Sequence, residues 1–180
     1  MRLFVAINFN DETRARLIAL QDELRSCSVR GRFSLPENLH LTLAFLGECD
    51  VKQTTAIKAV MNEINFDPFV INIDRVGRFK RDGGKQRVPA KSVATWWAGI
   101  QESKALAKLH SDLTDKLTAA DFKLDKRKFN PHITLGREII TSAAPWQIPP
   151  FGETVTNIEL MKSERINGKL TYTSIVTREP

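Results

Sequence analysis

HLTL at residues 40–43 returns as HITL at residues 132–135. Residues two apart on a β-strand point to the same face, so each motif places an imidazole and a hydroxyl on one face. The opposite face then carries two aliphatic side chains, which is typical of a strand that covers a core. The repeat therefore predicts two strands whose polar faces are free to form a site.

The elements around the two motifs repeat as well. A strand over 3–7 and a leucine-striped helix over about 12–26 precede the first motif. A strand over 93–100 and a leucine stripe over 106–117 precede the second motif. We therefore predict a duplicated strand–helix–strand unit that forms two lobes related by a pseudo-two-fold axis. The two His-x-Thr segments are expected to meet between the lobes.

The rest of the chain shows local signals only. A helix is expected over about 51–64 and an alternating strand over 69–73. Residues 80–91 are polar, basic and glycine-containing, which indicates a loop, and three prolines over 145–150 are expected to break the chain. Two further strands are predicted over 155–161 and 170–176, with a turn at Asn167-Gly168 between them.

Composition limits the classes of protein to which the chain can belong. Its 180 residues are 42% apolar and 27% charged, which is typical of a globular protein and excludes disordered and fibrous classes. No apolar run approaches the roughly 20 residues that span a bilayer, so no membrane association is expected. Cys27 and Cys49 are the only cysteines, which excludes a disulfide framework and favours a reducing cytoplasm. The net charge of +6 is compatible with a polyanionic partner.

The repeated residue types fit one kind of chemistry best. Two imidazoles with pKa values near about 6.5 can divide the acid and base roles at neutral pH. Such a pair suits an in-line displacement at phosphorus, and hydroxyls can donate to the non-bridging phosphoryl oxygens. Two histidines are too few to ligate a catalytic metal, and no carboxylate with a regular ligand spacing accompanies them. We therefore expect no metal and no cofactor.

The sequence resembles the two-histidine (2H) phosphoesterases, and among them the RNA 2′,3′-cyclic phosphodiesterases, historically called 2′-5′ RNA ligases. The similar stretches are RLFVAI at 2–7, PENLHLTLAFLGE at 36–48, WWAGI at 96–100, FNPHITLGR at 129–137 and LMKSERINGKLTY at 160–172. Ser163 and Tyr172 in the last stretch occupy places familiar from the family. Two features depart from the family pattern: Ala44 stands where many members carry a basic residue, and the basic stretch before WWAGI is long.

The resemblance implies an α+β fold in which two pseudo-symmetric lobes turn antiparallel sheets toward a central cleft, with helices outside. Residues 1–180 would then form a single bilobal domain. It also implies metal-independent hydrolysis of RNA 2′,3′-cyclic phosphate ends to 2′-phosphomonoesters, with weak reversible 2′-5′ ligation. By the same resemblance His40 is the proton donor, His132 is the proton acceptor, and Thr42 and Thr134 bind the phosphate.

Several further residues are candidates for substrate contact. Arg137 is five residues after His132, an offset that points it away from the histidine on a regular strand unless the chain bends at Gly136. Phe45 could offer a stacking surface, although its pattern favours a core position. One of Trp96 and Trp97 must face the core, which leaves Trp97 as a candidate for the cleft. The basic stretch adds four candidates for binding the RNA backbone, with a solvated loop as the alternative: Lys80, Arg81, Lys85 and Arg87.

The expected partner is RNA with a 2′,3′-cyclic phosphate terminus or a small cyclic nucleotide, bound by a monomer. Two alternatives stay open. One is a phosphodiesterase that acts on another cyclic or 2′-5′-linked nucleotide, and the other is a non-catalytic protein that binds RNA ends. Binding alone does not require two titrating groups, so the paired histidines favour an enzyme.

Overall fold

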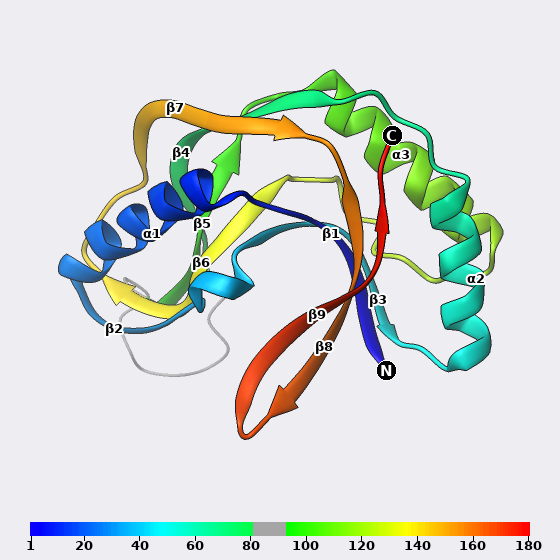
Figure 1. The fold of residues 1–180 in the computed structure, drawn as a ribbon. Coiled ribbons are helices and arrows are strands. Elements are labelled where there is room, and N and C mark those ends of the chain that lie inside the picture. Colours follow the sequence, from blue (N-terminus) through cyan, green and yellow to red (C-terminus); the bar gives the residue numbers. More distant parts are fainter. Residues whose placement is uncertain (81–92) are drawn as a thin grey trace.

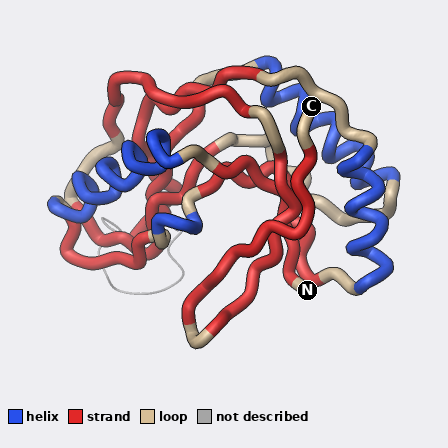
Figure 2. The backbone as a smooth tube through the Cα atoms, viewed as in Figure 1, coloured by secondary structure: helices blue, strands red, loops and turns tan. Residues whose placement is uncertain are grey.

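The computed structural model describes residues 1–80 and 93–180. In these residues the chain forms, in order, β1 (Arg2–Asn8), α1 (Asp11–Ser26), β2 (Ser28–Phe33), a short 3₁₀-helix (Pro36–Asn38), β3 (His40–Glu48), α2 (Val51–Asn62), β4 (Phe69–Lys80), β5 (Val93–Ile100), α3 (Lys104–Ala119), β6 (His132–Thr141), β7 (Trp146–Val155), β8 (Ile158–Ile166) and β9 (Lys169–Arg178). Figure 1 shows the course of the chain, and Figure 2 shows that strands make up most of the central part.

The strands form one sheet in the order β7-β4-β5-β6-β3-β1-β8-β9, and β2 pairs with β6 outside this path. Pairing between the described strands is antiparallel. The order is symmetric about the junction of β6 with β3, and each motif strand has an earlier strand beside it, β5 or β1. The junction itself rests on one residue pair, Leu41 with Ile133. The predicted α+β fold with two pseudo-symmetric halves is confirmed, and the structure adds that the halves form a continuous sheet.

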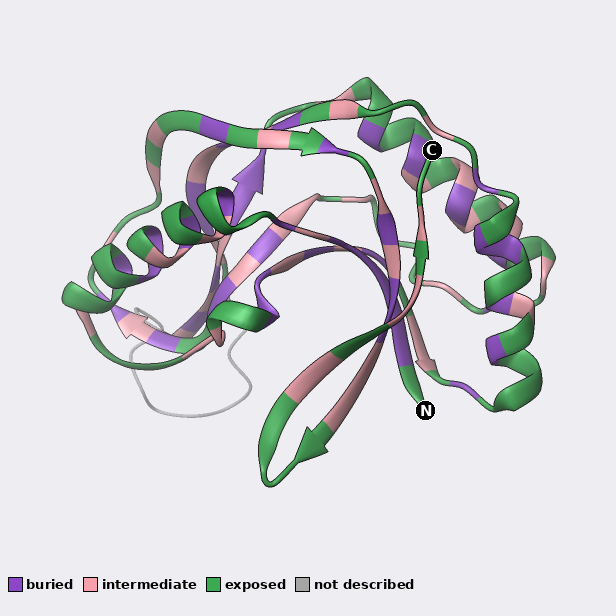
Figure 3. Cartoon of the chain, viewed as in Figure 1, coloured by how far each residue is buried: buried purple, intermediate pink, exposed green. Residues whose placement is uncertain are grey.

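The helices cover the outer faces of the two halves (Figure 1). α1 packs against β2, β6 and β7, whereas α2 and α3 pack against each other and against β9 and β3 respectively. The leucines of the predicted stripes on α1 and α3 are buried: Leu17, Leu20, Leu24, Leu106, Leu109, Leu113 and Leu117. Figure 3 shows these buried faces directed at the sheet. The aliphatic residues of both motifs join the same core, because Leu41 and Ile133 are fully buried.

The structure differs from the sequence expectations at the edges of the sheet. β2 was not predicted, since its residues are exposed along most of its length and show no alternation. β7 contains two of the three prolines that were expected to break the chain, and Pro145 lies in the irregular segment before it. Pro149 and Pro150 fall in a bulge of this edge strand, between the residues that pair with Ile73 and Arg75, where no ladder hydrogen bond is required of them.

Two predicted boundaries are also wrong. The strand predicted over 155–161 spans the end of β7 at Val155 and the start of β8 at Ile158, with a short connection between them. β4 extends to Lys80, so the first residue of the predicted basic loop is part of a strand. The remaining residues of that loop lie outside the described residues.

Within the described part, no helix is both long and apolar enough to cross a membrane.

Candidate active site

The two motifs line one cavity of about 910 Å³. β3 contributes His40 and Thr42, and β6 contributes His132 and Thr134. The strands adjoin in the middle of the sheet, so residues 92 positions apart in the sequence face the same space. The remaining walls come from the start of β1, the segment after β2 and the β8–β9 hairpin, whose cavity-lining residues include Ser34, Lys162, Ser163, Arg165 and Tyr172.

Each histidine is held by a backbone carbonyl two residues before it. Nδ1 of His40 lies 2.7 Å from the carbonyl oxygen of Asn38, and Nδ1 of His132 lies 2.7 Å from that of Asn130. A carbonyl oxygen only accepts hydrogen bonds, so Nδ1 must donate in both rings. The neutral imidazoles are therefore fixed as the tautomer whose Nε2 carries the lone pair that can accept a proton. Nε2 is thus the atom that can exchange a proton with a bound substrate.

The environment of Nε2 differs between the two rings. Nε2 of His40 is 3.0 Å from Oγ1 of Thr42, which donates to it in the neutral tautomer. Among the described residues, His132 has no such hydrogen-bonding partner at Nε2. The hydroxyl of Thr134 is likewise free of a side-chain hydrogen bond within the described part of the chain.

Two aromatic rings border each imidazole. The ring of His40 lies 4.8 Å from Phe4 and 5.2 Å from Tyr172, measured between ring centroids. The ring of His132 lies 5.0 Å from Phe79 and 6.2 Å from Trp97. The aromatics beside His132 come from β4 and β5, the two strands beyond β6, whereas those beside His40 come from β1 and from β9, the last strand of that half. The aromatic rings restrict the orientation of each imidazole and reduce its hydration.

Paired bulges turn two further residues toward the cavity. Relative to β5, β6 has one extra residue on each side of Gly136, and relative to β1, β3 has one extra residue on each side of the segment Ala44–Phe45. An extra residue exchanges the faces of a strand. Arg137 and Phe45, which would face the core on regular strands, consequently line the cavity. The positive φ of 54° at Glu138 is part of the bulge in β6.

These placements settle where the remaining described candidates lie. The core position favoured for Phe45 is wrong, because its side chain is 49% exposed and the guanidinium of Arg2 lies 5.0 Å from its ring centroid. Trp96 is fully buried, as expected for one member of the tryptophan pair. Trp97 packs behind His132 rather than in the cavity wall, and its ring lies so close to Gly77 that a Cβ there would be 2.3 Å from the indole.

Burial lowers the pKa of both motif histidines. For His40, loss of hydration is the main cause, the hydrogen bond to Asn38 opposes it, and the positive charges of Arg137 and His132 lower the pKa further. For His132 the same order holds, with Arg137 as the charge involved. A bound phosphate would bring negative charge to this site, which favours the protonated form of either ring.

Replacing Arg137 with glutamine is expected to raise the pKa of His40 and His132, because the substitution removes a positive charge that lowers both. An NMR titration of the imidazole C–H resonances measures this directly. His110 is an internal control: burial lowers its pKa too, but its charged neighbour is Asp115 and not Arg137. If only His110 moved, or if neither motif histidine moved, the charge of Arg137 would not act in the cavity.

Some cavity residues were missed by sequence reasoning. Arg2, Arg32, Ser34, Lys162 and Arg165 line the cavity but belong to no repeated motif. They lie on β1, on or just after β2, and on the β8–β9 hairpin, and only the tertiary fold brings them to the motifs. Of the predicted basic loop, Arg81, Lys85 and Arg87 lie outside the described residues.

Within the described part, no group of three or more histidine, cysteine, aspartate or glutamate side chains could hold a metal ion.

Comparison with known proteins identifies the family. The model of the LigT like Phosphoesterase family matches residues 7–90 and 99–172, which include both motifs. The chain belongs to the LigT-like phosphoesterase family.

Individual relatives of this LigT-like phosphoesterase cover nearly its whole length. It is 35% identical over 159 residues to the RNA 2′,3′-cyclic phosphodiesterase of Archaeoglobus fulgidus, which is 85% of each chain. It is 29% identical to the RNA 2′,3′-cyclic phosphodiesterase of Escherichia coli, over 97% of this chain and 93% of the relative. A crystal structure of E. coli LigT complexed with 3′-AMP superimposes with a TM-score of 0.81 and 28% identity, over 99% of this chain and 97% of that chain.

Proposed function

We propose that this protein hydrolyses RNA 2′,3′-cyclic phosphate ends to 2′-phosphomonoesters by acid–base catalysis at His40 and His132. The observation that carries the proposal is the pair of imidazoles in one cavity, each with Nδ1 bound to a carbonyl and Nε2 available for proton transfer. The curated relatives named RNA 2′,3′-cyclic phosphodiesterase support the substrate class. The E. coli LigT complex with 3′-AMP supports binding of a nucleotide.

The reaction needs two proton transfers: one away from the attacking water and one to the departing oxygen on the other side of the phosphorus atom. Neutral His132 accepts a proton at Nε2 from a water molecule, and the water oxygen forms the new bond to phosphorus. Protonated His40 donates a proton from Nε2 to the 3′ oxygen as the bond from that oxygen to phosphorus breaks. The products are a 3′-hydroxyl and a 2′-phosphomonoester. The two histidines end in exchanged protonation states and return to their starting states through solvent.

In this proposal three side chains stabilise the negative charge on the phosphoryl oxygens. The hydroxyls of Thr42 and Thr134 lie on the same strand faces as the histidines, so they can donate to the non-bridging oxygens. The Arg137 guanidinium adds a positive charge and a planar pair of donors from the bulge of β6. Donors that are fixed before the substrate binds require little reorganisation in the transition state.

The proposal is tested with a short RNA that ends in a 2′,3′-cyclic phosphate, incubated with the protein in the presence of EDTA. We expect complete conversion to the 2′-phosphomonoester, identified by ³¹P NMR or by comparison with both monophosphate isomers on chromatography. A 3′-phosphomonoester would contradict the assigned leaving oxygen. Loss of activity in EDTA that added divalent metal restores would contradict the metal-independent mechanism.

We also propose that residues 1–180 act as one bilobal unit, as a monomer in the cytoplasm. Both histidines, both threonines and Arg137 belong to this one cavity, which supports a site formed within one chain. Cys27 and Cys49 are both free thiols, which is consistent with a reducing compartment.

A further inference from the structure

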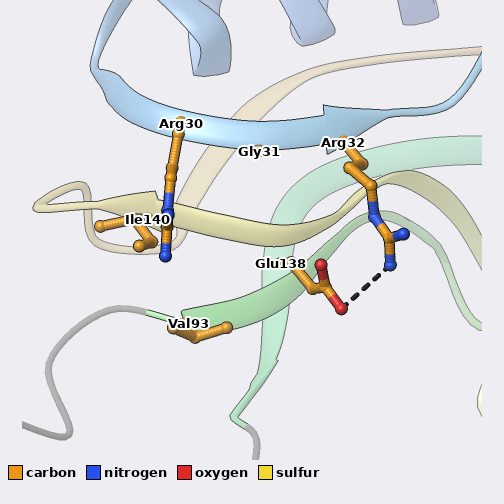
Figure 4. Close-up of a pocket in the computed structure, with 6 residues that line it drawn as sticks. All are labelled: Arg30, Gly31, Arg32, Val93, Glu138 and Ile140. Atoms are coloured by element: carbon orange, nitrogen blue, oxygen red, sulfur yellow. Dashed lines mark ion pairs between the residues drawn. The ribbon is translucent and has the colours of Figure 1, made fainter. Parts of the chain in front are cut away.

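A second, smaller cavity adjoins the catalytic cavity at Arg32. It has a volume of about 390 Å³ and is lined by Arg30, Gly31, Arg32, Val93, Glu138 and Ile140. Arg32 lines both cavities, so its side chain stands at the boundary between them. Figure 4 shows Arg30 and Arg32 extending from β2 toward the strands below, with Val93 and Ile140 beneath Arg30.

The small cavity carries positive charge that is only partly neutralised. The guanidinium nitrogen Nη2 of Arg32 lies 2.9 Å from the carboxylate oxygen Oε1 of Glu138. Within the described part of the chain, Arg30 forms neither an ion pair nor a side-chain hydrogen bond. A guanidinium is a planar donor that matches the geometry of a phosphate group. The aliphatic side chains of Val93 and Ile140 add an apolar surface that suits a sugar or the edge of a base.

The backbone of β2 is fitted closely to β6 at this cavity. A Cβ on Gly31 would lie 2.6 Å from Cγ1 and 3.0 Å from Cα of Ile139, so only glycine allows the two strands to approach this closely. Arg30 and Arg32 flank this glycine, and they pair with Ile140 and Arg137 of β6. The spacing of the two arginines is therefore fixed by paired strands and does not depend on a free loop.

The opposite flank of the catalytic cavity is basic too: Arg2 lies there over the ring of Phe45, and two further charges are engaged by protein partners. Nζ of Lys162 lies 2.7 Å from a carboxylate oxygen of Glu164. The guanidinium of Arg165 donates to the carbonyl oxygen of Gly168 at 3.0 Å, within the β8–β9 turn. A phosphate on that side would have to compete with these partners, whereas Arg30 needs no exchange of partners.

We propose that the cavity at Arg30 and Arg32 binds a phosphodiester of the RNA backbone on the 5′ side of the terminal nucleotide. The inference rests on the proposed function, because an RNA held by its terminal cyclic phosphate continues only from its 5′ side. The next anionic groups of the substrate must then leave the catalytic cavity, and the basic cavity that shares Arg32 with it lies beside this exit. The enzyme would accordingly prefer oligonucleotides to mononucleotides.

The test compares Arg30→Gln with Lys58→Gln, which removes one exposed positive charge from α2, remote from both cavities. For a five-nucleotide RNA with a 2′,3′-cyclic phosphate end, Arg30→Gln should raise KM roughly fivefold, which is the upper range for one exposed ion pair. The slope of log KM against log salt should become shallower by about 0.7, the value for one phosphate contact on a single strand. Lys58→Gln should match the unsubstituted protein in both measurements.

A nucleoside 2′,3′-cyclic monophosphate supplies the second arm, because it has no phosphodiester to reach Arg30. Its KM and kcat should be the same in Arg30→Gln and in the unsubstituted protein. Equal changes for both substrates, or no change in KM for the RNA at low salt, would overturn the inference. If the unsubstituted protein hydrolyses neither substrate, the proposed function fails separately. Fluorescence anisotropy of a labelled RNA pentamer at several salt concentrations then decides whether Arg30 binds its backbone.

Discussion

Replacing either His40 or His132 with alanine is expected to lower kcat for a 2′,3′-cyclic phosphate by about 10²–10⁴-fold, the usual contribution of a general acid or base. The double variant should be little worse than either single variant, because both protons must move in one reaction. The measurement is steady-state turnover of a nucleoside cyclic phosphate. Near-normal turnover in either single variant would contradict the paired mechanism.

The chain provides a matched control in its third histidine. The ring of His110 stacks on Phe129 with the centroids 3.7 Å apart, and His110 does not line the catalytic cavity. His110→Asn should therefore keep full turnover even if it unfolds at a lower temperature. Because His40 packs between Phe4 and Tyr172, His40→Gln is a useful second variant that retains most of the side-chain volume. Circular dichroism confirms that the variants compared are folded.

The pH dependence of kcat/KM separates the two roles. The unsubstituted enzyme should give a bell-shaped profile, since the base must be neutral and the acid protonated. Burial lowers the pKa of both rings in the free protein, so the maximum should lie below about pH 6.5, the ordinary pKa of histidine. His40→Ala should lose the alkaline limb and His132→Ala the acidic limb. The opposite pattern would reverse the assignment of acid and base.

Thr134→Val is expected to lower kcat by about 10²–10³-fold, which is typical when one preplaced donor to a developing oxyanion is removed. Valine keeps the shape of the side chain and removes only the hydroxyl, which in the described structure has no other side-chain partner to lose. Thr134→Ser keeps the hydroxyl and should retain most of the activity. Turnover of the two variants with a nucleoside cyclic phosphate is the measurement, and similar losses in both would indicate that packing, not donation, is what the threonine supplies.

Thr42 does not offer an equally clean experiment. Its hydroxyl also donates to Nε2 of His40 at 3.0 Å, so Thr42→Val would alter the histidine as well as the phosphate contact. The pKa of His40 should change in Thr42→Val, whereas the pKa of His132 should not change in Thr134→Val. An NMR titration of the two variants therefore reports which threonine acts through its histidine.

The sequence predicts the parts of the fold that alternate or repeat. The leucine stripes of α1 and α3 and the aliphatic face of the motif strands are buried as expected. The edge strands β2 and β7 escape prediction because neither has a fully buried face, and β7 also carries two prolines. Their place is fixed by partners distant in the sequence, which no local pattern reports.

The candidate site divides in the same way. Side chains alternate between the two faces of a strand, which predicts that the histidine and threonine of each motif share a face. The structure brings all four into one cavity. The alternation of a regular strand gives the wrong orientation for Arg137 and Phe45, because bulges add residues to both strands. Gly136 signals the bend that turns Arg137, but the bulges around Phe45 were not expected from the sequence. The carbonyl oxygens of Asn38 and Asn130 fix the histidine tautomers. They belong to the backbone, so the pattern of side chains in the sequence does not predict these hydrogen bonds.

The narrow junction between β3 and β6 determines the relative position of the two histidines, but not the orientation of either one. Each imidazole takes its tautomer and orientation from its own half of the sheet, so either motif could keep those properties if it were transplanted alone. The separation of the two Nε2 atoms has no such local origin. This distance is set at the junction of β3 with β6, where the single residue pair Leu41–Ile133 joins the duplicated halves. In the proposed mechanism each copy of the repeat positions its own proton-transferring group, whereas the junction of β3 with β6 sets the distance across which the phosphorus atom must fit.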